Sequence, residues 1–146
     1  MKRSPAQRFA RVIGLTLVAA GAIGFAYSSS FGSPGHTDSV LGILDVNGWH
    51  NLVHLATGAV GLAVAGSYER SRRYAVAVAL LYAAIAIWGF VIGDGESILQ
   101  LVPVNTEDSV LHALIAVAAC AAGFSTPATP PPTPAGGEPG PGFRFD

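Results

Sequence analysis

The hydropathy pattern of the chain consists of four apolar runs without Asp, Glu, Lys or Arg, separated by short polar segments. The runs cover residues 12–27, 49–66, 74–92 and 110–124. A helix that crosses a hydrocarbon core of roughly 30 Å needs about 20 apolar residues, and lipid accepts only segments whose backbone groups are satisfied internally. A soluble bundle would show a polar stripe along each helix, which the first and third runs lack. The pattern therefore predicts four membrane-spanning helices, at about residues 9–27, 49–67, 74–92 and 108–124.

The predicted fold class is therefore all-α, a four-helix transmembrane bundle. Residues 1–8 form a short N-terminal segment and residues 9–124 the membrane domain. Residues 125–146 hold seven of the ten prolines, and a segment of this composition cannot bury enough apolar surface to fold. We expect a disordered Pro/Gly-rich tail there.

Two pairs of segments resemble each other, which indicates an internal repeat. The aligned segments are 8–25 with 73–90, at a shift of 65, and 46–54 with 104–112, at a shift of 58. The second alignment pairs Asn47 with Asn105, His50 with Asp108, and His54 with His112. Each copy is a helical hairpin, so the copies are predicted to be parallel and related by an axis along the membrane normal. The basic N-terminus and first apolar run also resemble a cleavable signal peptide, but the repeat favours a retained helix.

The charges are few and segregated. Only 12% of residues are charged and the net charge is −1, which argues against a nucleic-acid partner. The basic residues outside the tail precede the first helix or lie between the second and third, while the two other loops, 28–48 and 93–109, hold no Lys or Arg. The positive-inside rule then predicts a multi-pass plasma-membrane protein with both termini in the cytoplasm. The predicted partners are the lipid bilayer and either a homo-oligomer or a membrane protein.

A polar and small-sided stripe is predicted along the second helix. His50, His54, Thr57 and Gly61 fall on one helix face at 100° per residue. Small residues at such a face allow close helix approach, and polar ones hydrogen-bond across helices. The predicted helix-packing and polar residues are Asn47, Asn51, Thr57, Gly58, Gly61 and Asn105. Asn47 and Asn105 are also expected to cap the second and fourth helices.

The same histidines allow a metal site as an alternative. His50 with His54 and Asp108 with His112 are both i, i+4 pairs, which place two ligands on one helix face. Three imidazoles and a carboxylate suit a divalent transition metal such as Zn(II), Fe(II) or Cu(II). A haem held by His54 and His112 is a further alternative. Asp108 has a second interpretation, because a carboxylate in the first helical turn complements the helix dipole.

No enzymatic constellation appears in the sequence. There is no Gly-rich phosphate loop and no nucleophile with a positioned base. The single cysteine, Cys120, excludes an intramolecular disulfide and is expected to be a small buried hydrophobe. The sequence thus predicts a non-enzymatic structural or accessory membrane component, in which an outward-facing Asn/His/Asp cluster joins the second and fourth helices. The alternative is a metal- or haem-binding membrane protein with a redox or sensing role.

Two motifs carry a family resemblance: "NGWHNLVHLATGAVGL" from Asn47 and "VPVNTEDSVLHALIAVAACAAG" from Val102. They resemble the domain-of-unknown-function 4383 family of small bacterial membrane proteins, common in actinobacteria. The resemblance covers about residues 8–123 and leaves out the longer first loop and the tail. Because the activity of that family is unknown, the resemblance implies a four-helix architecture and adds no chemistry.

Overall fold

The computed structural model describes residues 3–32 and 37–130 of the chain. Its helices are α1 (Pro5–Tyr27), α2 (Gly48–Val64), α3 (Tyr68–Ile92) and α4 (Thr106–Phe124). Its strands are β1 (Asp38–Val40), β2 (Leu44–Val46), β3 (Ser97–Ile98) and β4 (Val102–Pro103). The predicted all-α class with four helices is confirmed, and the short strands were not predicted. Most of the predicted tail, residues 131–146, lies outside the described residues.

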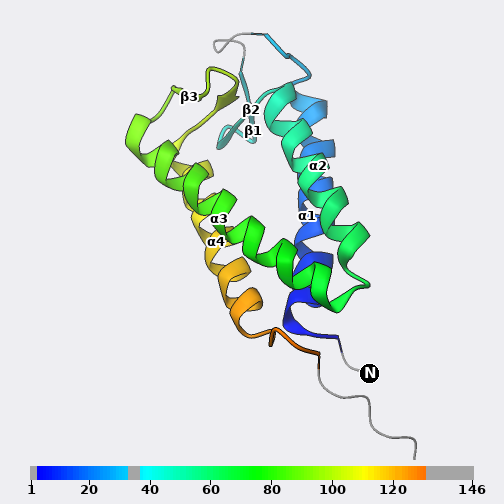
Figure 1. The fold of residues 1–146 in the computed structure, drawn as a ribbon. Coiled ribbons are helices and arrows are strands. Elements are labelled where there is room, and N and C mark those ends of the chain that lie inside the picture. The colour runs from blue at the N-terminus through cyan, green and yellow to red at the C-terminus, as the bar shows by residue number, and fades with distance from the viewer. Residues whose placement is uncertain (1–2, 33–36, 131–146) are drawn as a thin grey trace, which may run out of the picture.

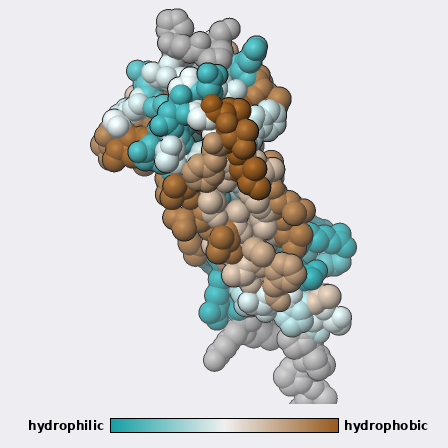
Figure 2. Space-filling view, turned by 90° about the vertical axis from the view of Figure 1, so that its left-hand side faces the viewer, coloured by the Kyte–Doolittle hydropathy of each residue, from teal (hydrophilic) through white to brown (hydrophobic). Residues whose placement is uncertain are grey.

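Three of the four helices are long and apolar enough to cross a membrane: α1, α3 and α4. The 17 residues of α2 span about 26 Å at 1.5 Å per residue. Large apolar side chains face outward, including Leu80 at 71% exposure and Val117 at 68%. Figure 2 shows a band of hydrophobic surface between two more polar ends on the face in view. The chain is compatible with insertion in a lipid bilayer.

The boundary between α2 and α3 differs from the prediction. We expected the second helix to end near residue 67 and the third to begin at 74, but α2 ends at Val64 and α3 begins at Tyr68. The hydroxyl of Ser67 caps α3, and Glu69 pairs with Arg73 one turn later. Arginine and glutamate are good helix formers, so the basic segment continues the helix and the turn is short.

The helices form two antiparallel hairpins, α1 with α2 and α3 with α4 (Figure 1). The start of α1 and the α2–α3 turn lie at one end of the molecule, which we call the terminal end. The four strands lie at the other end, which we call the strand end. The hairpins contact each other mainly through α1, which packs on α3 and α4, whereas direct packing of α2 on α4 is slight.

Small residues set the close contact within the first hairpin. A Cβ added at Gly58 would lie 2.7 Å from the carbonyl oxygen of Gly14 on α1, and one added at Gly21 would lie 2.7 Å from that of Asn51. The buried core between the hairpins comes from α1, α3 and α4 and includes Leu17, Tyr82 and Ala119. Gly58 of α2 therefore packs on α1, its own hairpin partner, whereas Thr57 and Gly61 of the predicted stripe also contact Tyr74 of α3.

Each hairpin carries a two-stranded β-hairpin at the strand end. Val40 pairs with Leu44 in the first and Ile98 with Val102 in the second. In both, two residues of positive φ form the turn: Leu41 and Gly42, then Leu99 and Gln100. Positive φ at both central positions is the type I′ geometry that fits twisted strands.

The residues that follow α4 are ordered against the terminal end. Thr126 is 1% exposed, accepts a hydrogen bond from the Ala6 N–H at 2.9 Å and donates one to the Ala122 carbonyl. Arg72 donates to the Thr126 carbonyl at 2.9 Å. The predicted tail beginning at residue 125 was therefore placed too early, because Thr126 satisfies an N–H of the first turn of α1. Cys120, expected to be buried, is exposed on α4.

Candidate functional site

Three imidazoles converge at the strand end, and we call them the histidine cluster. His50 and His54 come from the first turns of α2, and His112 comes from α4. One ring nitrogen from each lies within 4.8 Å of the other two, and the Nε2 atoms of His50 and His54 are 3.2 Å apart. His50 and His112 are buried, at 3% and 6% exposure, whereas His54 is half-buried.

A backbone carbonyl fixes the orientation of His50. Its Nδ1 lies 2.9 Å from the carbonyl oxygen of Asp45 in β2. A carbonyl can only accept a hydrogen bond, so Nδ1 carries the proton when the ring is neutral. The lone pair of His50 Nε2 then points toward His54, whose Nε2–H can donate to it.

His112 lacks a comparable contact. Its Nδ1 is buried and has no hydrogen-bond partner within residues 3–32 and 37–130, and the same holds for the hydroxyl of Tyr82. The two rings stand edge to face with centroids 5.3 Å apart. Because a buried polar atom without a partner costs about 1–3 kcal/mol, this nitrogen is a costly feature for a purely structural cluster.

The fourth predicted ligand, Asp108, lies apart from the histidine cluster. Its Oδ2 accepts a hydrogen bond from the Asp45 N–H at 3.1 Å. Asp108 lies in the first turn of α4. Asn105 caps that helix, because its Oδ1 accepts a hydrogen bond from the Asp108 N–H at 2.8 Å. The carboxylate thus contacts the first β-hairpin and is not one of the converging ligand groups.

Asn47 and Asn105 cap their helices, as expected, and also connect the two hairpins. The Oδ1 of Asn47 accepts from the His50 N–H at 2.9 Å. The Nδ2 of Asn47 donates to the Leu101 carbonyl at 2.6 Å, and the Nδ2 of Asn105 donates to the Ile43 carbonyl at 2.7 Å. We call these two reciprocal hydrogen bonds the asparagine bridge.

The remaining predicted packing residues contact α1 or α3. They are Asn51, Thr57, Gly58 and Gly61. The Nδ2 of Asn51 donates to the Ser28 carbonyl after α1 at 2.8 Å. The Tyr74 hydroxyl of α3 donates to the Thr57 carbonyl at 3.1 Å, and a Cβ at Gly61 would lie 2.6 Å from that hydroxyl. These contacts order the helices around the histidine cluster and lie outside it.

Two residues of the site were missed in the sequence. Asp45 contacts both His50 and Asp108 from β2, a strand too short to give a periodic pattern. Tyr82 had a usable signal, because Tyr74, Val78 and Tyr82 recur every four residues on one face of α3, and all three are buried.

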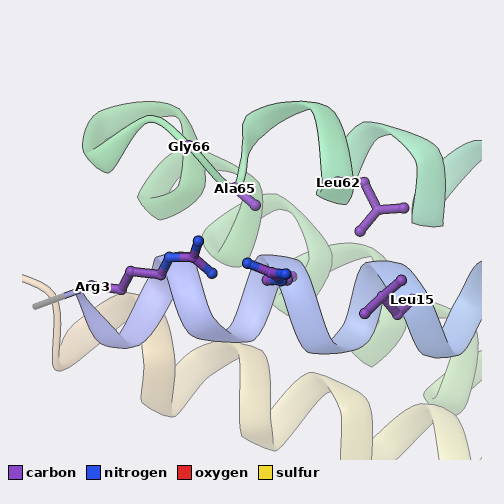
Figure 3. Close-up of a pocket in the computed structure, with 6 residues that line it drawn as sticks. Arg3, Leu15, Leu62, Ala65 and Gly66 are labelled. Atoms are coloured by element: carbon purple, nitrogen blue, oxygen red, sulfur yellow. The ribbon is translucent and has the colours of Figure 1, made fainter.

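A separate groove of about 360 Å³ lies at the terminal end, between α1 and α2 (Figure 3). Arg3 and Arg11 line it together with Leu15, Leu62 and the backbone near Gly66. It shares no residue with the histidine cluster. Its basic side chains lie at the end of the molecule where the positive-inside rule predicts cytoplasm.

Comparison with protein families gives a match over most of the chain. The model for the family described as "Domain of unknown function (DUF4383)" matches residues 7–125. The comparisons with curated proteins and with solved structures found no match.

Proposed function

The chain belongs to the DUF4383 family, and from this premise we propose that it is a multi-pass plasma-membrane protein with a structural or accessory role and no enzymatic activity. The helices themselves support the membrane assignment. The proposed role is to hold two helical hairpins in a fixed relation and to present a rigid polar surface outside the cytoplasm.

The distribution of charge supports the orientation. Arg8, Arg11 and Arg70 lie in the first turns of α1 and α3, at the terminal end. Asp45 and Asp94 lie beyond the helices at the strand end, in segments without Lys or Arg. Under the positive-inside rule the terminal end faces the cytoplasm and the strand end faces outward.

The asparagine bridge is the observation that carries the proposal. Its two hydrogen bonds are equivalent under the shift of 58, because Asn47 corresponds to Asn105 and Ile43 to Leu101. The paired strands and the positive-φ turns follow the same shift. Matching local geometry and reciprocal contacts are what a two-fold arrangement of duplicated, parallel hairpins requires.

The asparagine bridge joins the two hairpins at the strand end, where α2 and α4 make little direct contact with each other. Direct packing of α2 on α4 is slight, so the β-hairpins and their asparagine contacts join the two halves at this end. A net intramolecular hydrogen bond contributes about 0.5–1.5 kcal/mol. Two of them, arranged reciprocally, join the two hairpins at the strand end at a modest energy.

Transition-metal binding, with a redox or sensing role, is the second candidate function. The convergence of three imidazoles favours it. A haem between His54 and His112 is disfavoured, because the ring of His50 lies beside both, with centroids 4.4 Å and 5.9 Å away. The macrocycle would need the space that this ring occupies.

Site-specific labelling tests the orientation. In a Cys120→Ala background, the exposed Glu96 at the strand end and Arg70 at the terminal end are each replaced by cysteine. A membrane-impermeant maleimide applied to intact cells should label the first and not the second. Labelling of the cysteine at 70 in intact cells would overturn the proposed topology.

Serine variants test the structural role. Serine is a good helix cap, so Asn47→Ser and Asn105→Ser retain capping and remove only the donor of the asparagine bridge. The double variant should be less stable and less abundant in the membrane. If it matched the wild type in both, the bridge would not be what holds the hairpins together.

A further inference from the structure

We propose that His50, His54 and His112 bind one divalent transition metal ion of the Zn²⁺ class, through three neutral imidazoles, with a fourth position left open. This inference does not depend on the asparagine bridge, and it replaces the four-ligand set expected from sequence by a three-ligand one.

The spacing of the ring nitrogens fits such an ion. Zinc–nitrogen bonds of 2.0–2.1 Å in a tetrahedral site place two ligand nitrogens about 3.3 Å apart. The His50 and His54 Nε2 atoms are already 3.2 Å apart, and the third nitrogen lies within 4.8 Å of both. The third nitrogen needs to move by at most about 1.5 Å, from 4.8 Å to about 3.3 Å, to reach the tetrahedral spacing.

The protonation of His50 is already suitable for coordination. Its Nδ1–H faces the Asp45 carbonyl at 2.9 Å, and metal-binding histidines typically donate the second ring N–H to such a carbonyl or to a carboxylate. The Nε2 lone pair is therefore free for the ion. When the ion binds, the proton on His54 Nε2 moves to Nδ1 of the same neutral ring, so the step needs no net loss of a proton.

The unpartnered nitrogen of His112 is the second observation that points to a ligand. His112 is 6% exposed and its Nδ1 has no hydrogen-bond partner in the described part of the chain. A ring kept only for structure would be expected to use its buried nitrogen in a hydrogen bond. The His112 ring packs against Tyr82 and leaves this nitrogen without a partner, so its position is not explained by a hydrogen bond.

The histidine cluster has a solvent-accessible side. The Asp45 carbonyl faces His50 Nδ1, and the Asp45 N–H donates to the Asp108 carboxylate. Neither carboxylate belongs to the converging ligand group, so the three imidazoles are the proposed protein ligands. Because His54 is only half-buried, a water molecule or small anion can reach the open fourth position.

The test uses the full-length protein, purified in detergent without a polyhistidine tag, stripped with a chelator and titrated with Zn²⁺ alone. We expect one Zn²⁺ per chain by calorimetry and elemental analysis, and a tetrahedral visible spectrum when Co²⁺ replaces it. Loss of an outer-shell contact lowers metal affinity about 10–100-fold, so His112→Gln, which removes a ligand, should lower the affinity at least tenfold.

Asp108→Asn is the matched control. Its amide oxygen can still accept from the Asp45 N–H, and Zn²⁺ affinity should change far less than in His112→Gln. A loss equal to that of the histidine variant would overturn the three-ligand site. So would equal Zn²⁺ binding by the wild type and a folded His50→Gln/His54→Gln/His112→Gln variant.

X-ray absorption of the zinc-loaded wild type does not depend on any variant folding. We expect three imidazole nitrogens and one further ligand from water or a small anion around the ion, and a spectrum without imidazole scattering would refute the proposal. Failure of these experiments leaves the structural role intact, because that role is tested by the asparagine variants.

Discussion

Replacing Asn47 by serine should destabilise the protein by about 1–2 kcal/mol, because the part-buried Leu101 carbonyl loses its donor. Asn47 is 3% exposed and its Nδ2 donates to the Leu101 carbonyl at 2.6 Å. The shorter serine side chain can still accept from the N–H at position 50 as a helix cap, but it cannot reach the second β-hairpin. The Leu101 carbonyl is partly accessible, which places the expected cost toward the lower part of the general range of about 1–3 kcal/mol.

The same change at Asn105 should cost less. Asn105 donates to the Ile43 carbonyl at 2.7 Å in a more exposed setting, so Asn105→Ser should cost about 0.5–1 kcal/mol. If both bonds hold the same two hairpins together, the double variant should deviate from additivity by about 0.5 kcal/mol or more. Variants at unrelated sites usually add to within about 0.3–0.5 kcal/mol.

The assay is reversible unfolding in mixed micelles, followed by helix content. Alanine at the same positions removes the cap as well and should cost about a further 1 kcal/mol, which separates capping from bridging. If serine cost as much as alanine, or if the two serine variants added independently, the hairpins would not be coupled through the asparagine bridge.

Further variants test the packing at each end. Gly21→Ala should destabilise by about 1–3 kcal/mol, because the new Cβ would lie 2.7 Å from the Asn51 carbonyl oxygen; Gly66→Ala, which meets nothing within 4 Å, is its control and should be near neutral in the same unfolding assay. Thr126→Val should cost about 1–3 kcal/mol, because it leaves the Ala6 N–H without its buried acceptor. An unchanged unfolding free energy for Thr126→Val would mean that the chain after α4 does not stabilise the terminal end.

In the histidine cluster, two positions that the sequence alignment pairs with each other make different contacts. The sequence pairs His54 with His112 but His50 with Asp108, and a four-ligand site was a reasonable expectation from the i, i+4 spacings. In the structure His50 turns toward the other two rings while Asp108 turns toward the backbone of Asp45. This difference arises at Asp45 of β2, because its N–H donates to Asp108 while its carbonyl faces Nδ1 of His50. In the alignment at a shift of 58 the position that corresponds to Asp45 is Pro103, which has no N–H to donate.

The sequence by itself determined the features that depend on neighbouring residues. Apolar runs predicted the four helices, and Asn47 and Asn105 predicted two of the helix starts, because hydropathy and capping act over a single turn or segment. Only the tertiary structure decided that α2 packs on α1 and only slightly on α4, and that each asparagine also reaches a carbonyl 54 or 62 residues away. Contacts of that range depend on the angle at which two hairpins meet. That angle is set by the sum of many small packing contacts and leaves no periodic signal in the chain.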